Sequence, residues 1–317
     1  MKKIIDVIDL NPEIQWVIAI ILIILVFATL LFWIWSMITP SKLVDEMQTR
    51  TKSWWIMCCI FLFASIINPV VTYFALGFLS FLTLREVYSL LNLREMDRSI
   101  LFICYLSIPI QYYFAFKGYY TLFLIFIPVF MFIIIPFLLV LTGETKDIIR
   151  SMCILPTSLM LGVFGISHLA LLISFPEMNS NGISGKALLL FLIFITEAND
   201  IMQFVWGKIF GKHQILPSVS PNKTWEGFIG GVLSTTVIGY FMGFLTPLSS
   251  WQLIFLSFTI AILGFMGDAI ISAVKRDFGV KDMGKSIPGH GGILDRVDSL
   301  STTASPFFHL IYFIILS

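Results

Sequence analysis

Residues 251–274, WQLIFLSFTIAILGFMGDAIISAV, run directly into residues 275–298, KRDFGVKDMGKSIPGHGGILDRVD. The first stretch carries one charged residue, Asp268. An apolar helix of about 20 residues can cross the roughly 30 Å hydrocarbon core of a bilayer. The second stretch holds five of the chain's 20 basic residues and four of its 19 acidic residues. The pair predicts a membrane span that leads straight into a densely charged loop.

The composition extends this prediction to the whole chain. Of 317 residues, 58% are hydrophobic and 12% are charged. Soluble domains carry roughly 25% charged residues. This chain has about half that share, too few charged residues to cover the surface of a water-soluble protein. We therefore expect an all-α, polytopic integral membrane protein. A net charge of +1 argues against a nucleic-acid partner, because phosphate contacts require a basic excess.

Hydrophobic segments of span length recur along the chain. The long ones are 16–38, 119–141, 152–175, 187–206, 227–247 and 251–274, and the shorter ones are 99–116 and 301–317. Residues 54–84 are long for one span and short for two, with Asn68-Pro69 at their middle. We therefore expect about nine transmembrane helices, or ten if 54–84 splits. One membrane domain is expected, with N-terminal helices in 1–180 and C-terminal helices and charged loops in 181–317.

Lysine and arginine gather in two loops, 207–226 and 275–298, and the hairpin between them around 247–250 has no charge. Cytoplasmic loops collect basic residues, so both charged loops are expected to face the cytoplasm. The side of the N-terminus depends on whether 54–84 splits. Four cysteines and a cytoplasmic site fit a bacterial inner membrane.

The loop 275–298 mixes charges of both signs with five glycines, unlike a simple positively charged anchor. Glycine lets the backbone approach a ligand closely. Basic side chains, backbone N–H groups and carboxylates together suit a polyphosphate and its divalent metal. A solvated loop between two spans is the alternative.

Asp268 lies inside an apolar run, where an unpaired carboxylate costs several kcal/mol. On a helix, Asp268, Ser272 and Lys275 share one face. Asp295 and Asp298 share another face if the last span begins there. Three carboxylates from two helix ends could then converge on one or two metal ions. Alternatively, Asp268 neutralises Lys275 or the arginine that follows it.

The loop 207–226 contains Ser220-Pro221, a helix-start pattern with Ser as N-cap and Pro in the first helical position. Lys223 and the free N–H groups of that turn would bind an anion. An ordinary capped entry into the next span explains the same residues equally well.

Polar residues also interrupt the apolar span at 187–206. They are Glu197, Asn199, Asp200 and Gln203. Polar groups at that depth usually face the bundle interior or a water-filled cavity. Hydrogen bonding between helices is the alternative.

The end of the span 251–274 and the loop that follows it, 275–298, have a recognisable pattern. The run is Ser272-x-Val274-Lys275-Arg276-x4-Lys281-Asp282-x-Gly284-x2-Ile287-Pro288-x-His290-Gly291-Gly292-Ile293-x-Asp295-Arg296-Val297-Asp298. It resembles the signature of the phosphatidate cytidylyltransferases, the CDP-diacylglycerol synthases. Supporting similarity extends back through 220–227, SPNKTWEG, to Gly207-Lys208 and Asp200. About the last third of the chain carries this resemblance.

The resemblance implies a reaction of phospholipid biosynthesis, in which CTP and phosphatidic acid give CDP-diacylglycerol and pyrophosphate. The implied cofactor is Mg2+, with a second cation as an option. The partners would be CTP, phosphatidic acid and membrane lipids, and a homodimer is a further option.

The resemblance also implies roles for individual residues. The implied metal ligands are Asp268, Asp295 and Asp298. The implied catalytic residues are Asp268, Asp295, Lys275, Arg276 and Lys281. The implied substrate-binding residues are Asp200, Ser220, Asn222, Lys223, Asp282, His290, Gly291, Gly292 and Arg296.

One departure concerns Gln203-Phe204, where many family members have Ala-Tyr, and it leaves the lipid preference open. Two other functions stay open as well. One is a CTP-dependent lipid kinase of the polyprenol type, which uses similar basic, glycine-containing loops. The other is an ion-coupled transporter whose path is lined by Asp200 and Asp268.

Overall fold

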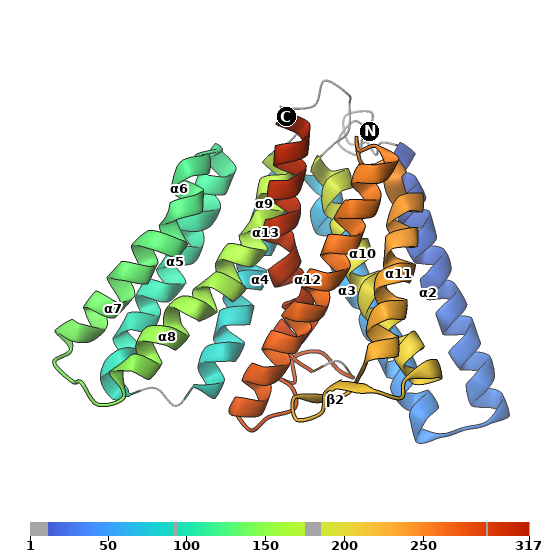
Figure 1. Cartoon of the computed structure of the whole chain (residues 1–317), viewed down its shortest axis with the longest axis horizontal. Coiled ribbons are helices and arrows are strands. Elements are labelled where there is room, and N and C mark those ends of the chain that lie inside the picture. The colour runs from blue at the N-terminus through green and yellow to red at the C-terminus, as the bar shows by residue number, and fades with distance from the viewer. Residues whose placement is uncertain (1–11, 92–93, 175–184, 290, 317) are drawn as a thin grey trace.

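The computed structural model describes residues 12–91, 94–174, 185–289 and 291–316, which form ten helical passes (Figure 1). The first five are α2 (Pro12–Ile38), α3 (Lys42–Ile67), α4 (Pro69–Leu90), α5 (Arg98–Lys117) and the continuous α6, η2 and α7 (Tyr120–Ile125, Phe126–Met131 and Phe132–Leu141). The others are the continuous α8, η3 and α9 (Ile148–Leu159, Met160–Gly165 and Ile166–Ser174), α10 (Gly185–Phe210), α11 with its extension η5 (Trp225–Phe241 and Met242–Leu245), α12 (Ser250–Asp277) and α13 (Leu294–Leu316). The short elements are η1 (Glu95–Asp97), β1 (Gln214–Leu216) and β2 (Ser220–Thr224).

These helices confirm the all-α polytopic membrane fold and resolve the ambiguous stretch 54–84. Eight of the described helices are long and apolar enough to cross a membrane. The other two passes, α3 and α13, carry charged residues in their first turns. α3 ends at Ile67 because Asn68 is extended and caps α4, its side chain accepting from the Val70 N–H at 2.9 Å. Pro69 then begins α4, so the ten-helix alternative holds.

The two halves of the chain share one core. α13 packs against α9 and η3, and α10 also packs against α9. Leu169, Leu189 and Phe307 are fully buried in this core. α2 begins and α13 ends at one edge of the bundle, whereas β2 and the segment after α12 lie at the opposite edge (Figure 1). Both charged loops therefore share one side of the molecule.

Glycines let the C-terminal helices cross closely at their polar positions. A Cβ on Gly231 of α11 would lie 2.3 Å from the Cγ of Gln203 on α10. A Cβ on Gly267 of α12 would lie 2.9 Å from the carbonyl oxygen of Asp298 on α13. Small residues permit such contacts between membrane helices. These crossings bring the polar faces of the helices against one another.

The second charged loop folds as a small antiparallel hairpin and not as the predicted helix start. β1 and β2 pair with Ser220 opposite Leu216. α11 begins only at Trp225, and Thr224 caps it, its hydroxyl accepting from the Gly227 N–H at 3.1 Å. The prediction that Ser220 caps a helix is therefore wrong, because pairing with β1 keeps this segment extended.

Candidate active site

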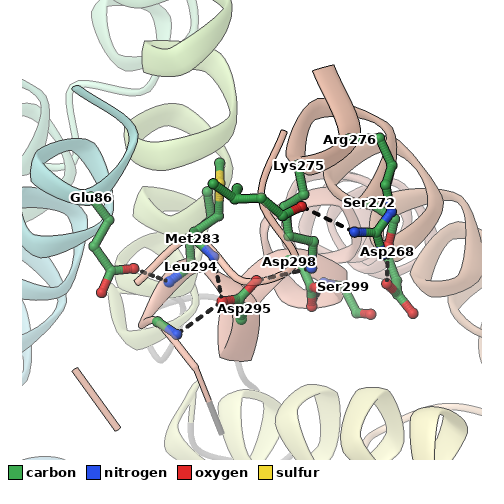
Figure 2. Close-up of polar contacts among 12 residues, drawn as sticks. Glu86, Asp268, Ser272, Lys275, Arg276, Met283, Leu294, Asp295, Asp298 and Ser299 are labelled. Carbon is green, nitrogen blue, oxygen red and sulfur yellow. Dashed lines mark hydrogen bonds and ion pairs between the residues drawn. The ribbon is translucent and has the colours of Figure 1, made fainter. Parts of the chain in front are cut away.

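Residues 278–293, between α12 and α13, form the signature loop, and Asp295 binds its backbone at two places. The Oδ2 atom of Asp295 accepts from the backbone N–H of Met283 at 2.8 Å and of Gly292 at 2.9 Å. Its Oδ1 atom accepts from Lys275 Nζ at 2.9 Å, and both side chains are buried (Figure 2). Both oxygens of this carboxylate are therefore used inside the protein.

A second carboxylate, Glu86 of α4, reaches the signature loop from the N-terminal half (Figure 2). Its Oε2 accepts from the Leu294 N–H at 3.0 Å, and its Oε1 accepts from the Ser286 hydroxyl at 2.6 Å. Glu86 is only 8% exposed. Sequence reasoning missed this residue, although a charged side chain inside an apolar helix was the available signal.

The predicted polar face of α12 is present. The Ser272 hydroxyl donates to Asp268 Oδ1 at 3.1 Å, one turn away. Lys223 Nζ on β2 pairs with Asp268 Oδ2 at 2.6 Å and lies 4.5 Å from the centre of the Phe265 ring. The alternative that Asp268 neutralises Lys275 or the next arginine is wrong. The hairpin supplies the cation instead, and Lys275 pairs with Asp295.

A third polar group lies where α10 meets α13. Ser299 donates its backbone N–H to Asp298 Oδ1 at 2.8 Å and its hydroxyl to Asp200 Oδ1 at 3.2 Å. Asp200, Asp268 and Asp298 are close enough for their charges to repel one another, and we call these three the carboxylate cluster. Arg296 is close enough to Asp298 to attract it electrostatically.

Arg276 joins the two charged loops. Its Nε donates to the carbonyl oxygen of Val219, just before β2, at 3.0 Å. Its Nη1 donates to the carbonyl oxygen of Val280, in the signature loop, also at 3.0 Å. The guanidinium therefore fixes the hairpin relative to the signature loop.

The remaining predicted residues lie on these two loops. Lys281, Asp282 and Asn222 have exposed side chains. Gly291 has a φ of +83°, a left-handed conformation that favours glycine. His290 lies outside the described residues.

The predicted metal ligands Asp268, Asp295 and Asp298 do not converge as a set of three. In the part of the chain that the structure describes, no group of three or more His, Cys, Asp or Glu side chains is arranged to hold a metal ion. Asp295 is committed to backbone N–H groups and Lys275. Mg2+, however, is commonly bound by one or two carboxylates together with substrate phosphates. Asp298 and Asp268, whose oxygens contact Ser272 and Lys223, are the predicted ligands left for that kind of site, and Mg2+ stays a prediction.

Comparison with known proteins covers nearly the whole chain. A family model described as "Cytidylyltransferase family" matches residues 48–315. The match therefore extends well beyond the last third of the chain to which the sequence motifs pointed. It includes α4 and most of α3, and thus Glu86.

Individual relatives differ in how much of the chain they match. The chain is 39% identical over 295 residues to "Uncharacterized protein YnbB" of Escherichia coli (strain K12), covering 90% of this chain and 94% of that protein. It is 41% identical over 117 residues to a phosphatidate cytidylyltransferase of Staphylococcus haemolyticus (strain JCSC1435), covering 36% of this chain and 45% of the relative. It is 42% identical over 114 residues to a phosphatidate cytidylyltransferase of Mycobacterium leprae (strain TN), covering 36% of each chain. The likeness to these two enzymes thus spans less than half of their length.

Proposed function

Because this chain belongs to the cytidylyltransferase family, we propose that it transfers the cytidylyl group of CTP to phosphatidic acid and releases pyrophosphate. Family membership supports CTP as the nucleotide. The location of the site supports a lipid acceptor, because Asp200 and Asp268 of the carboxylate cluster lie in helices long and apolar enough to cross a membrane, and the cationic loops adjoin the ends of these helices. A nucleotide can approach those loops from water, and a lipid phosphate can approach from the bilayer. The lipid product would be CDP-diacylglycerol.

In the proposed reaction, an oxygen of the lipid phosphate attacks the α-phosphorus of CTP. The bond from that phosphorus to the oxygen bridging to the β-phosphate breaks, and pyrophosphate leaves. Both reactants are anions, so positive charge is needed where they meet and where pyrophosphate departs. The lipid phosphate is already ionised near neutral pH, so the reaction does not require a general base.

The positive charge that this reaction needs is available on both loops. Lys223 pairs with Asp268, and Arg296 lies close to Asp298, so both cations border the carboxylate cluster. Lys281 and Lys285 are exposed on the signature loop, where they can meet nucleotide phosphates. Bound to Asp268 and Asp298, Mg2+ would act as a Lewis acid that neutralises phosphate charge.

We also propose that the edge carrying both charged loops faces the cytoplasm of a bacterial inner membrane. The basic residues of the two loops support this orientation. With ten passes, α2 would begin and α13 would end on the opposite side (Figure 1). A homodimer stays a prediction.

A label-position assay tests the proposed reaction. Purified protein in detergent is incubated with phosphatidic acid, Mg2+ and CTP labelled at either the α- or the γ-phosphate. We expect label from the α position in the lipid product. Label from the γ position alone would indicate a lipid kinase. If neither label moves, the acceptor or the enzymatic function is wrong, and ion flux in vesicles would test the transporter alternative.

A further inference from the structure

The signature loop rests on the N-terminal helices as well as on Asp295. Glu86 of α4 accepts from Ser286 inside the loop and from the Leu294 N–H directly after it. These contacts join residues far apart in sequence: Glu86 and Ser286 are separated by 200 positions, and Glu86 and Leu294 by 208. The loop is therefore held from both halves of the chain.

The loop backbone also closes tightly around the Glu86 carboxylate. A Cβ on Gly292 would lie 2.5 Å from Glu86 Oε2, and a Cβ on Gly284 would lie 2.8 Å from Glu86 Oε1. At Gly292 the added Cβ would also lie 2.8 Å from the backbone nitrogen of Gly284, so this position requires glycine. At Gly284 a side chain would displace the Glu86 carboxylate. The carboxylate acts as the core around which these loop segments fold.

α3 contacts the turn of the loop between Ser286 and Gly292. The Ser53 hydroxyl donates to the carbonyl oxygen of Pro288 at 2.7 Å. A Cβ on Gly289 would lie 3.3 Å from the Cγ of Arg50. α3 and α4 thus limit how the turn before Gly291 can be placed.

We propose that Glu86 is a positioning residue that sets the geometry of the phosphate-binding signature loop, an inference that rests on the proposed function. Glu86 is buried and acts through Ser286 and Leu294, without contacting the substrate itself. Lys281 and Lys285 are carried by the backbone that Glu86 orders. Displacing that backbone moves these cations away from the nucleotide phosphates.

Three variants test this role. Glu86→Leu removes both acceptors at similar size. Glu86→Gln can keep both contacts, because its oxygen can accept from Leu294 while its amide donates to the Ser286 hydroxyl. Ser286→Ala removes one contact and leaves α4 unchanged. Glu95→Gln is the matched control, since Glu95 is exposed in η1 away from the loop.

Two measurements are made on each full-length variant in detergent. The first is the rate of trypsin cleavage after Lys285, with and without CTP, which reports loop order independently of any reaction. The second is the KM for CTP and kcat. We expect Glu86→Leu to speed cleavage and to raise the KM about tenfold with little change in kcat, since a lost contact that supports binding equally in ground and transition states acts on KM. Glu86→Gln should restore both values, Ser286→Ala should be intermediate, and Glu95→Gln should match the wild type.

Wild-type cleavage and wild-type KM in Glu86→Leu would overturn the proposal. If Glu86→Leu does not accumulate in membranes, Ser286→Ala becomes the test of the proposal. A wild-type cleavage rate and a wild-type KM for CTP in Ser286→Ala would then overturn it. If no variant transfers label from CTP, the proposed function fails while the cleavage pattern still tests whether Glu86 orders the loop.

Discussion

The two charged loops lie at the same edge of the bundle but are held in opposite ways. The signature loop donates backbone N–H groups to Asp295 and the Ser286 hydroxyl to Glu86, and both carboxylates are buried. The hairpin is held by its own strand pairing and by Glu226, which accepts from the backbone of Lys212 at 3.0 Å. Buried charge therefore fixes the first loop, whereas backbone pairing fixes the second and presents Lys223 to the carboxylate cluster. The two loops are both rich in charged residues, but buried carboxylates order the backbone of the signature loop, whereas the hairpin places a lysine beside the carboxylate cluster.

Replacing separately the carboxylates that the two loops contact, Asp268 on α12 and Asp295 on α13, gives the largest expected effects. Asp268→Asn should reduce turnover by about a hundred- to a thousandfold, because it removes one of the two carboxylates proposed to hold Mg2+ against the reacting phosphates. Its unfolding temperature and trypsin cleavage after Lys285 should stay near wild type. Asp295→Asn should also inactivate the protein, but by loosening the signature loop. It should cost about 3 kcal/mol in stability, since Lys275 is left buried without its partner.

Activity, thermal unfolding and cleavage of the two variants are measured side by side. If Asp295→Asn kept wild-type stability and cleavage while losing activity, Asp295 would act on the reaction and not through the loop. The comparison between the two loops would then lose its main support.

Lys223 is the cation that the hairpin contributes to the carboxylate cluster. Lys223→Met should lower kcat/KM about a hundredfold, because the charge that offsets phosphate repulsion is removed. Lys212→Met is the matched control, since that side chain is exposed at the base of the same hairpin and should leave kcat/KM near wild type. Equal losses in both variants would show that the hairpin acts only through its overall charge. Steady-state kinetics with CTP as the varied substrate measures the difference.

Gly279 and Gly291 both have a positive φ in the signature loop, and replacing each by alanine distinguishes the cost of backbone strain from the cost of a steric contact with Asp295. Gly279 has a φ of +69° with nothing within 4 Å of an added Cβ, so Gly279→Ala should cost about 1 kcal/mol through backbone strain alone. In Gly291 the added Cβ would also lie 2.8 Å from Asp295 Oδ2. Gly291→Ala should therefore be the more destabilising change and should speed cleavage after Lys285. Similar unfolding temperatures for both variants would argue that the Asp295 contact does not order the loop.

Local periodicity predicted those parts of the site that lie within one helix. Asp268 and Ser272 share a face of α12 because they are one turn apart, and their hydrogen bond confirms it. Asn68-Pro69 likewise marked the break between α3 and α4, because an Asn cap followed by Pro ends one helix and starts another. Both results depend on neighbours in sequence.

The parts that could not be predicted depend on how distant helices pack. Glu86 meets the signature loop only because α4 lies against it, and no local pattern reports that contact. Ser220 has a local helix-start pattern, but pairing with β1 overrides it. The pairing of Lys223 with Asp268 likewise requires the hairpin to fold back over α12. Sequence therefore identified the charged residues of the site but not their partners.

The smallest expected effect concerns how the hairpin is anchored. Glu226 accepts from the backbone N–H of Lys212 at 3.0 Å and of His213 at 3.2 Å, and it also contacts His213 Nδ1 at 2.6 Å. Glu226→Ala should lower the unfolding temperature only slightly, because the N–H groups of the exposed Lys212 and His213 can bond to water instead. His213→Ala removes the side-chain contact and keeps both backbone contacts, so its effect should be smaller still. Thermal unfolding and the KM for CTP measure both. A larger loss in His213→Ala than in Glu226→Ala would mean that the imidazole, and not the backbone anchoring, holds the hairpin where Lys223 reaches Asp268.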